Sequence, residues 1–503
     1  MTTCFANPGT SEMHFVAGLD EVPEMRGILC LFEGVATGAA DGFARATGRP
    51  AATLLHLGPG LANGWANLHN ARRAHVPLIN IVGDHATYHS KFDAPLQSDI
   101  APVAAALKGW QRSTQHPDEV ANDTADAISA AYGPPGQIAT LVLPANVSWG
   151  EVTTPPPSWP VASRAGLVSP DEKLLGQSIN LLRNKRSALF VGGSAVTKEQ
   201  LALAQRIVQA SGARLLMETF PAIMDRGVGV VSPERLIYLS EFAISQLKDL
   251  DALILIGATT PVGFFAYPDV ESELTSEGCE VVNLAPPGSD TLATLSALVD
   301  GLEAPHVVIA SGERPGLPNG ELTTQNLAAA IAATLPEDVI IADESNTGGM
   351  HLYGVSQFSS PHRLMTLTGG SIGFGLPSAL GAAVGSAQRV LALEADGSMM
   401  YTLQALWTMA RESLDVTVVA LSNRSYAILN LERQRVGATS EGVTSQRMLE
   451  LDHPTIDLCG LARAQGVPSI RVTTAQDLVT ALQRSYATPG PMFIEAVLPK
   501  GLS

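Results

Sequence analysis

Short continuous apolar runs alternate with helical patterns along the chain of 503 residues, and this alternation restricts its fold more than any other feature. Such runs are typical of parallel strands with helices covering both faces of the sheet. The expected strands of the first third are Gly27–Phe32, Ala52–His56, Pro77–Val82 and Gln137–Leu143. Helical patterns lie between them, at Gly34–Thr47 and Gly64–Ala74. The sequence therefore predicts βαβ units in an α/β protein.

The alternation recurs in two further segments, so we expect three consecutive doubly wound parallel-sheet domains at residues 1–155, 165–310 and 320–503. The proline-rich run 153–160 predicts a stiff linker after the first domain. The expected strands of the later segments are Ser187–Val191, Ala213–Met217, Asp251–Ile256, Glu280–Asn283, Val339–Ala342, Val390–Glu394, Val416–Leu421 and Met492–Val497. The expected helices there are Thr197–Ala210, Leu322–Leu335, Ser371–Gly385 and Leu403–Glu412.

Charge and cysteine usage exclude several classes of protein. The formal net charge is −17, and no basic stripe offsets it, which argues against nucleic acid as a partner. No segment approaches the roughly 18 apolar residues of a membrane span. Four cysteines without CxxC spacing form neither a disulfide framework nor a zinc cluster. Because the N-terminus also lacks the features of a secretory leader, we expect a soluble cytoplasmic protein.

A carboxylate stands at the start of a helix built almost wholly from small residues. Glu33 follows an expected strand, and Gly34, Gly38 and Gly42 recur every fourth residue. Residues four apart share one face of a helix, and glycines on that face allow very close approach. Glutamate is also favoured at a helix N-terminus for electrostatic reasons alone. The glycine spacing favours a functional position, because surface helices do not require a glycine at every turn.

Polar residues follow two expected strands of the third segment. Asp396 follows one strand, and Asn423 and Ser425 follow the next. Parallel neighbours bring such residues together at the carboxyl edge, where open α/β sheets bind ligands. An all-oxygen set suits Mg²⁺, so we predict Asp396, Asn423 and the backbone carbonyl of Ser425 as metal ligands. Asp and Asn are also common in turns, and either half alone would be weak evidence.

The Glu33 helix and the set formed by Asp396, Asn423 and Ser425 have an order and separation along the chain that resemble one family. That family is the thiamine diphosphate enzymes that include benzoylformate decarboxylase, pyruvate decarboxylase and acetolactate synthase. The family signature Gly-Asp-Gly…Asn-Asn corresponds here to Ala395-Asp396-Gly397…Ser422-Asn423, which keeps both side-chain metal ligands. The resemblance covers essentially the whole chain. It implies a thiamine diphosphate-binding fold, with pyrimidine-binding and diphosphate-binding domains flanking a central Rossmann-like domain. It also implies thiamine diphosphate and Mg²⁺ as cofactors.

The resemblance gives roles to further residues. It implies that the Glu33 carboxylate hydrogen-bonds the aminopyrimidine of the cofactor and so promotes loss of the thiazolium C2 proton. Ile372 fits the bulky apolar residue beneath the bent cofactor. The remaining predicted cofactor-binding residues are Asn346, Thr347, Gly370, Ser371, Asp396, Gly397, Ser398, Asn423, Ser425 and Tyr426.

The N-terminal region points to one branch of the family. The run Asn7–Glu12 resembles the Asn-Pro-Gly-Ser-Asn-Glu run of benzoylformate decarboxylase, which implies that Thr10 contacts the substrate carboxylate. His56, at a strand end, matches a proton-relay histidine there, although a lone histidine is more often structural. A second relay histidine is replaced near Ala266. We predict Thr10, Glu33 and His56 as catalytic residues of a non-oxidative 2-oxo acid decarboxylase or carboligase, a lyase.

Three alternatives stay open, and one of them is a catalytically silent scaffold that retains the fold. The run Pro95–Ile100 is closer to acetolactate synthases, which implies condensation of 2-oxo acids, with FAD in the middle segment as an option that no motif supports. From a different class, the pair Gly192-Gly193 after one strand and Glu218 after the next would suit a dinucleotide-binding oxidoreductase. The full GxGxxG spacing is missing, and a glycine pair at a strand end is usually a tight turn.

The resemblance also implies an oligomer. In that family, the groups corresponding to Glu33 and Asp396 come from different subunits. A homodimer is then the minimal active unit, a homotetramer is common, and the active sites lie at the subunit interface. The small-residue helix that begins near Gly34 is consistent with close packing across such an interface.

Overall fold

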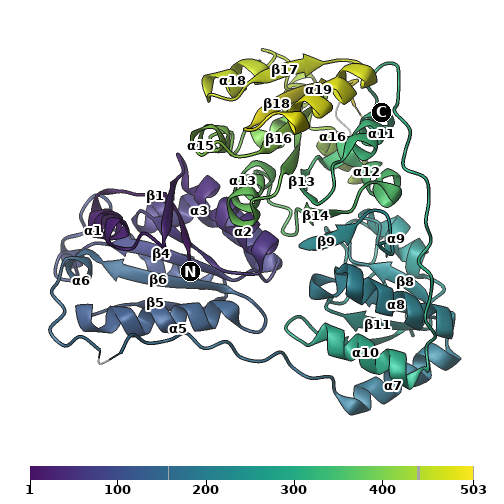
Figure 1. Ribbon diagram of the computed structural model, residues 1–503, viewed down its shortest axis with the longest axis horizontal. Coiled ribbons are helices and arrows are strands. Elements are labelled where there is room, and N and C mark those ends of the chain that lie inside the picture. Colours follow the sequence, from purple (N-terminus) through teal and green to yellow (C-terminus); the bar gives the residue numbers. More distant parts are fainter. Residues whose placement is uncertain (157, 439–441, 502–503) are drawn as a thin grey trace.

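The computed structural model describes residues 1–156, 158–438 and 442–501, and it contains three separate sheets. Two long connections link the three units: one runs from the first unit to the second, and the other from the second to the third (Figure 1). Part of the predicted stiff linker, residue 157, lies outside the described residues, as do 502 and 503. Within the described ranges, no helix has the length and apolar character needed to cross a membrane.

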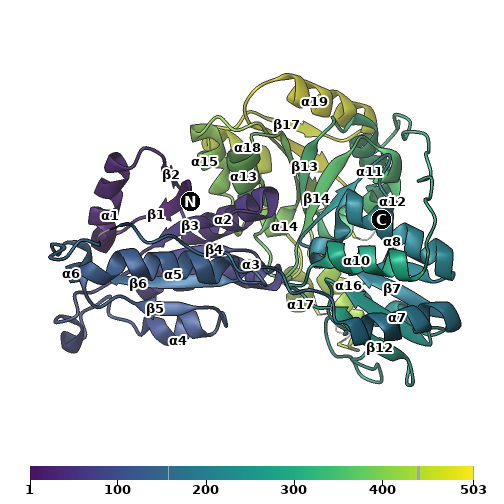
Figure 2. The same cartoon turned by 60° about the horizontal axis from the view of Figure 1, so that its bottom comes forward.

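The first unit is a six-stranded parallel sheet of order β2-β1-β3-β4-β6-β5, with helices on both faces (Figure 2). Its strands are β1 (Thr3–Asn7), β2 (Arg26–Leu29), β3 (Ala51–Leu55), β4 (Leu78–Asp84), β5 (Gln111–Ser113) and β6 (Ile138–Pro144). Its helices are α1 (Met13–Gly18), α2 (Glu33–Thr47), α3 (Leu57–Arg73), α4 (Ile100–Ala105), α5 (Val120–Tyr132) and α6 (Ala145–Ser148). Fully buried strands such as β3 explain the continuous apolar runs.

The second unit is a five-stranded parallel sheet of order β10-β8-β7-β11-β12. Its strands are β7 (Ser187–Val191), β8 (Arg214–Met217), β10 (Glu234–Arg235), β11 (Ala252–Ile256) and β12 (Glu280–Ala285). Its helices are α7 (Glu172–Asn184), α8 (Lys198–Ser211), α9 (Ser240–Leu247) and α10 (Thr291–Gly301).

The third unit is a seven-stranded sheet of order β17-β18-β16-β15-β13-β14-β9. Its strands are β9 (Ile223–Arg226), β13 (Val339–Glu344), β14 (His362–Thr366), β15 (Val390–Ala395), β16 (Val416–Ser422), β17 (Ser469–Val472) and β18 (Met492–Val497). Its helices are α11 (Thr324–Thr334), α12 (Leu352–Val355), α13 (Gly375–Ser386), α14 (Asp396–Met399), α15 (Ala405–Arg411), α16 (Ala427–Arg435), α17 (Val443–Arg447), α18 (Leu458–Ala464) and α19 (Ala475–Ala487).

Three parallel α/β sheets confirm the predicted fold class, with one exception. Strand β9 lies within the segment expected to form the middle domain, yet it pairs antiparallel with β14 of the third sheet. The pattern of apolar runs did not predict this strand, because β9 is short and carries Asp225 and Arg226. The boundaries of the three domains stay predictions.

The face of α2 that carries glycines packs against α13 of the same chain. A Cβ added at Gly42 would lie 2.1 Å from the carbonyl oxygen of Ser378, and one at Gly381 would lie 1.7 Å from that of Ala39. The two backbones therefore touch, which requires glycine at these positions. The structure corrects the expectation that this helix face serves a subunit interface, since α13 already occupies it.

Candidate active site

The carboxyl ends of β15 and β16 hold the predicted metal ligands. The two strands are parallel neighbours, and Ala395 pairs with Leu421 in their register. Asp396 and Asn423 follow directly, so the register brings them to one edge of the sheet. They border a cavity lined by Ser345, Asn346, Thr347, Gly348, Ala395, Asp396, Gly397, Ser398, Leu421, Asn423, Ser425, Tyr426, Ala427 and Ile428. All of the predicted third-unit residues except those of the loop at 370–372 are among them.

Asp396 is the charged group of this cavity. Its side chain is buried, with Oδ2 accepting from the backbone N–H of Arg424 at 2.6 Å and Oδ1 from that of Gly397 at 2.9 Å. Burial raises the pKa of Asp396 to about 6, although these hydrogen bonds favour the ionised form. A buried carboxylate whose ionised form is disfavoured gains from a nearby cation, so the residues present fit a bound Mg²⁺.

The rest of the cavity wall provides oxygen atoms and close backbone approach. Asn423 Oδ1 accepts from the Ser425 N–H at 3.0 Å, and Asn346 Nδ2 donates to Ser398 Oγ at 2.9 Å. A Cβ at Gly397 would lie 2.5 Å from the Tyr426 ring, so only glycine leaves this wall intact. The first glycine of the family signature is replaced by Ala395, but this second one is kept. The wall combines these polar groups with the apolar side chains of Leu421 and Ile428.

The predicted residues Gly370, Ser371 and Ile372 do not lie in a helix. We expected a helix from Ser371, but α13 begins at Gly375, and the preceding residues form a loop. Gly370 has φ +72°, a conformation that glycine adopts freely and that a continuing helix excludes. Ile372 is half-buried and packs against the main apolar core. None of the three lines the Asp396 cavity in a single chain.

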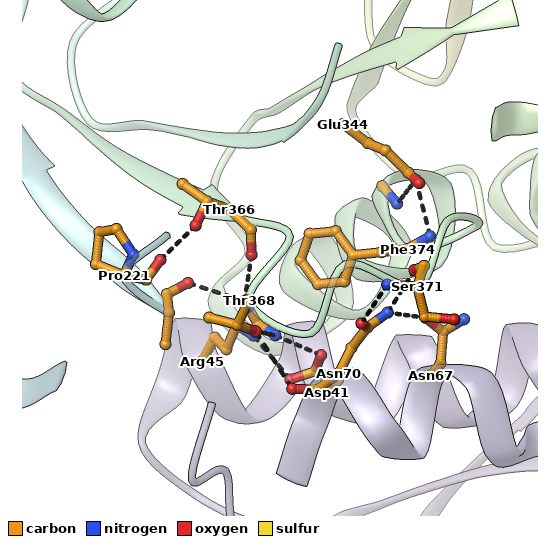
Figure 3. A network of polar contacts seen from close by, with 12 residues as sticks. Asp41, Arg45, Asn67, Asn70, Pro221, Glu344, Thr366, Thr368, Ser371 and Phe374 are labelled. Carbon is orange, nitrogen blue, oxygen red and sulfur yellow. Dashed lines mark hydrogen bonds and ion pairs between the residues drawn. The ribbon is translucent and has the colours of Figure 1, made fainter. Parts of the chain in front are cut away.

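This loop is anchored from both sides (Figure 3). Asn70 of α3 accepts from the Ser371 N–H at 3.2 Å and donates to its carbonyl oxygen at 2.8 Å, and Asn67 Nδ2 donates to the Gly373 carbonyl oxygen at 3.0 Å. From the third sheet, the buried Glu344 carboxylate accepts from three backbone N–H groups, those of Gly373, Phe374 and Gly375. Hydrogen bonds from the first and third units therefore fix the path of the loop backbone.

Arg45 anchors the start of the same loop (Figure 3). Its Nε and Nη2 donate to the two carboxylate oxygens of Asp41 at 2.8 and 2.7 Å. Its other N–H groups reach the Thr366 carbonyl oxygen at 2.7 Å, the Ala222 carbonyl oxygen at 3.0 Å and Thr368 Oγ1 at 2.9 Å. All five guanidinium N–H groups are thus used. One buried side chain joins the first unit, the β9 segment and the third unit.

Glu33 is placed as the sequence predicted, at the first residue of α2. It is 7% exposed, and its Oε2 accepts from Asn63 Nδ2 at 3.1 Å. A Cβ at Gly60 would lie 3.3 Å from its Oε1, so α3 passes close to the carboxylate. Glu33 does not line the Asp396 cavity of its own chain. The structure of one chain therefore leaves the two predicted ends of the site apart.

The predicted residues Thr10 and His56 lie at the carboxyl edge of the first sheet. Thr10 is exposed at the start of a 3₁₀ turn, Thr10–Glu12, and His56 precedes α3. His56 Nδ1 lies 2.9 Å from Glu12 Oε2, a contact that the sequence reasoning missed. No local spacing predicts this contact, because it joins residues 44 positions apart in the chain.

The second unit does not present the features of a dinucleotide site. The turn Gly192-Gly193 follows β7 as expected, but Glu218 Oε1 accepts from the Gly193 N–H at 2.7 Å. The Glu218 carboxylate is therefore already hydrogen-bonded inside the protein, and burial raises its pKa to about 7. A dinucleotide site would need the Glu218 carboxylate free for a ribose and the Gly193 N–H free for a phosphate. The oxidoreductase alternative gains no support.

The buried acids Glu344 and Glu394 form a second feature that the sequence reasoning missed. They are register partners on β13 and β15, and neither oxygen of Glu394 has a hydrogen-bond partner in the described part of the chain. Burial raises the pKa of Glu394 well above its usual range, and the neighbouring Glu344 adds to the effect. Burial and the neighbouring Glu344 both disfavour the ionised form of Glu394, whereas three N–H donors favour the ionised form of Glu344.

Comparisons with known proteins agree with the geometry at both ends of the chain. The family model "Thiamine pyrophosphate enzyme, N-terminal TPP binding domain" matches residues 1–117, and "Thiamine pyrophosphate enzyme, C-terminal TPP binding domain" matches 347–496. The chain is 51% identical over 502 residues to the "Putative acetolactate synthase large subunit IlvX" of Mycobacterium tuberculosis, covering 99% of this chain and 96% of that protein.

More distant relatives extend the comparison to the decarboxylases. The chain is 29% identical to benzoylformate decarboxylase of Pseudomonas aeruginosa, covering 98% of this chain and 96% of that protein. The thiamine diphosphate-dependent 4-hydroxybenzoylformate decarboxylase of Rhodococcus jostii shares the fold, with a TM-score of 0.85 at 22% identity, covering 100% of this chain and 97% of the other. The chain belongs to the thiamine pyrophosphate-dependent enzymes, in the family of acetolactate synthases and benzoylformate decarboxylase.

Proposed function

We propose that the protein is a cytoplasmic, Mg²⁺-dependent enzyme that decarboxylates a 2-oxo acid without oxidation, or joins the resulting acyl unit to a second carbonyl compound. The observation that supports this most is the cavity in which Asp396, Asn423 and Ser425 meet at the carboxyl ends of β15 and β16. Its oxygen atoms suit a divalent cation that also binds a diphosphate. Asn346, Thr347, Gly397, Ser398 and Tyr426 would hold the diphosphate beside it.

Thiamine diphosphate, when bound, supplies a thiazolium ring that accepts the electron pair released as CO₂ leaves. The residues of this chain would do the rest. Glu33 would hold a proton at the aminopyrimidine end, and Ile372 would support the bent cofactor. Thr10 would orient the substrate carboxylate through its hydroxyl, and His56 would move a proton to or from the substrate.

Acetolactate synthase-like condensation is a second candidate, and the 51% identity to a relative carrying that name favours it. We do not propose FAD for it, because the turn at Gly193 is already hydrogen-bonded by Glu218. The two candidates share the same cofactor site and differ in the acceptor of the acyl unit: a proton in one case and a second 2-oxo acid in the other.

The deciding experiment is a screen of the purified chain with thiamine diphosphate and Mg²⁺ against pyruvate, benzoylformate and branched 2-oxo acids. CO₂ release and the carbon products are measured together. Aldehyde as the main product supports decarboxylation, and acetohydroxy acid supports condensation. The absence of CO₂ from every substrate, in protein shown to bind the cofactor, would contradict the proposal.

A further inference from the structure

The histidine predicted to move protons is held by a buried carboxylate that no role accounts for. Glu12 is 3% exposed, and its Oε2 lies 2.9 Å from His56 Nδ1. The same oxygen accepts from the Gly9 N–H at 2.8 Å. Nε2 of His56 has no hydrogen-bond partner among the residues the structure describes, so the ring is fixed through Nδ1 alone.

Two glycines pack against Glu12 and His56 at positions where any larger residue would clash. A Cβ at Gly9 would lie 2.2 Å from the His56 ring, so the ring is packed against the bare backbone of the turn. A Cβ at Gly83 of β4 would lie 1.7 Å from Glu12 Oε1, and that oxygen is buried without a partner among the described residues. Leaving a carboxylate oxygen buried and unpaired costs stability, so the position needs a reason other than folding.

Capping of the Thr10–Glu12 turn does not explain why Glu12 is buried. A second capped turn in the same chain shows this. Glu119 ends a second 3₁₀ turn, Pro117–Glu119, and reaches back to the N–H groups of Gln115 and His116 at 3.2 Å each. This acid does the same capping while exposed to solvent. Burial beside a histidine ring is what distinguishes Glu12.

We infer that Glu12 is a positioning residue for His56. Its carboxylate accepts the Nδ1–H, which fixes the tautomer and the ring plane and leaves the Nε2 lone pair as the only proton acceptor on the ring. Nε2 then takes a proton and returns it in the reaction proposed above, on which this inference rests. No proton passes to Glu12, because its task is orientation and electrostatic support.

The test uses Glu12→Gln, with Glu119→Gln as the matched control. We expect Glu12→Gln to lower turnover by about 10- to 100-fold, less than the ~10²–10⁴-fold that a general acid–base group contributes. Thiamine diphosphate affinity and the exchange of the cofactor C2 proton should stay as in the wild type, because both depend on other residues. Glu119→Gln should leave all three unchanged. A merely structural role for Glu12 would disturb all of them together.

A double-mutant cycle separates positioning from an independent effect. In a His56→Asn background, Glu12→Gln should lower turnover no further, because its effect passes through the ring. Multiplicative losses would overturn the inference, and so would wild-type turnover in Glu12→Gln.

A spectroscopic readout keeps the inference testable without turnover. ¹⁵N NMR of His56 in the wild-type protein should show the Nδ1–H tautomer, and an Nε2–H tautomer would overturn the inference. If the protein turns over no 2-oxo acid, the proposed function fails, whereas the tautomer still decides the role of Glu12.

Discussion

Replacing Arg45 with methionine should destabilise the protein far more than removal of most single side chains. The change removes all five hydrogen bonds of the guanidinium and leaves Asp41, which is 0% exposed, without its partner. Breaking a buried ion pair by removing one partner costs about 3–5 kcal/mol. Three further groups lose a donor: the carbonyl oxygens of Ala222 and Thr366, and Thr368 Oγ1. The expected loss lies at the upper end of that range.

The assay is urea unfolding followed by circular dichroism, with the free energy of unfolding taken from the first transition. Arg45→Lys keeps the charge but offers three donors in place of five, so we expect a smaller loss, about 1–3 kcal/mol. The double variant Asp41→Leu/Arg45→Met removes both charges and should recover most of the stability lost in Arg45→Met. A loss under about 1 kcal/mol in Arg45→Met, or no recovery in the double variant, would refute the reasoning.

Three further predictions concern the acids. Glu33→Gln should keep cofactor affinity but lower turnover by at least about 10²-fold, as general acid–base groups do, and steady-state kinetics with unchanged turnover would contradict its role. Mixing inactive Glu33→Gln and Asp396→Ala subunits should restore part of the activity if each site combines two chains; no recovery after subunit exchange would contradict the proposed interface site. Glu394→Gln should flatten the pH dependence of stability measured by urea unfolding between pH 5 and 8. Its raised pKa means that folding takes up a proton, so wild-type stability falls as pH rises above the usual carboxyl range, by at most about 1.4 kcal/mol per pH unit. A wild-type slope unaffected by Glu394→Gln would contradict this assignment.

The strands were predictable because burial on both faces leaves a continuous apolar run. Strands Ser187–Val191 and Met492–Val497 have the bounds that the sequence predicted. Helix α3 begins at Leu57, earlier than the expected Gly64, because Gly58, Pro59 and Gly60 mask the pattern. Strand β9 was missed because a four-residue strand at a sheet edge carries no periodicity.

Chemistry at strand ends was easier to predict than contacts between distant segments. Asp396 and Asn423 could be placed together because neighbouring parallel strands align their carboxyl ends. The partners of Arg45 other than Asp41 lie 177 to 323 residues away, and no local sequence pattern predicts these contacts. The i, i+4 spacing of Asp41 and Arg45 predicts a helical ion pair but not its burial. The contact between Glu12 and His56 likewise joins two turns that only the fold brings together.

Calorimetric titration of thiamine diphosphate into the protein with Mg²⁺ at pH 7.5 is the sharpest measurement. At this pH, above the pKa of about 6 of Asp396, the carboxyl is ionised and able to ligate. We predict saturable binding to the wild type, loss of affinity by at least about 10–100-fold in Asp396→Ala and on removal of Mg²⁺ by chelation, and retained affinity in Glu33→Gln. Equal affinity of wild type and Asp396→Ala, or no binding by the wild type, would show that this cavity does not hold the cofactor.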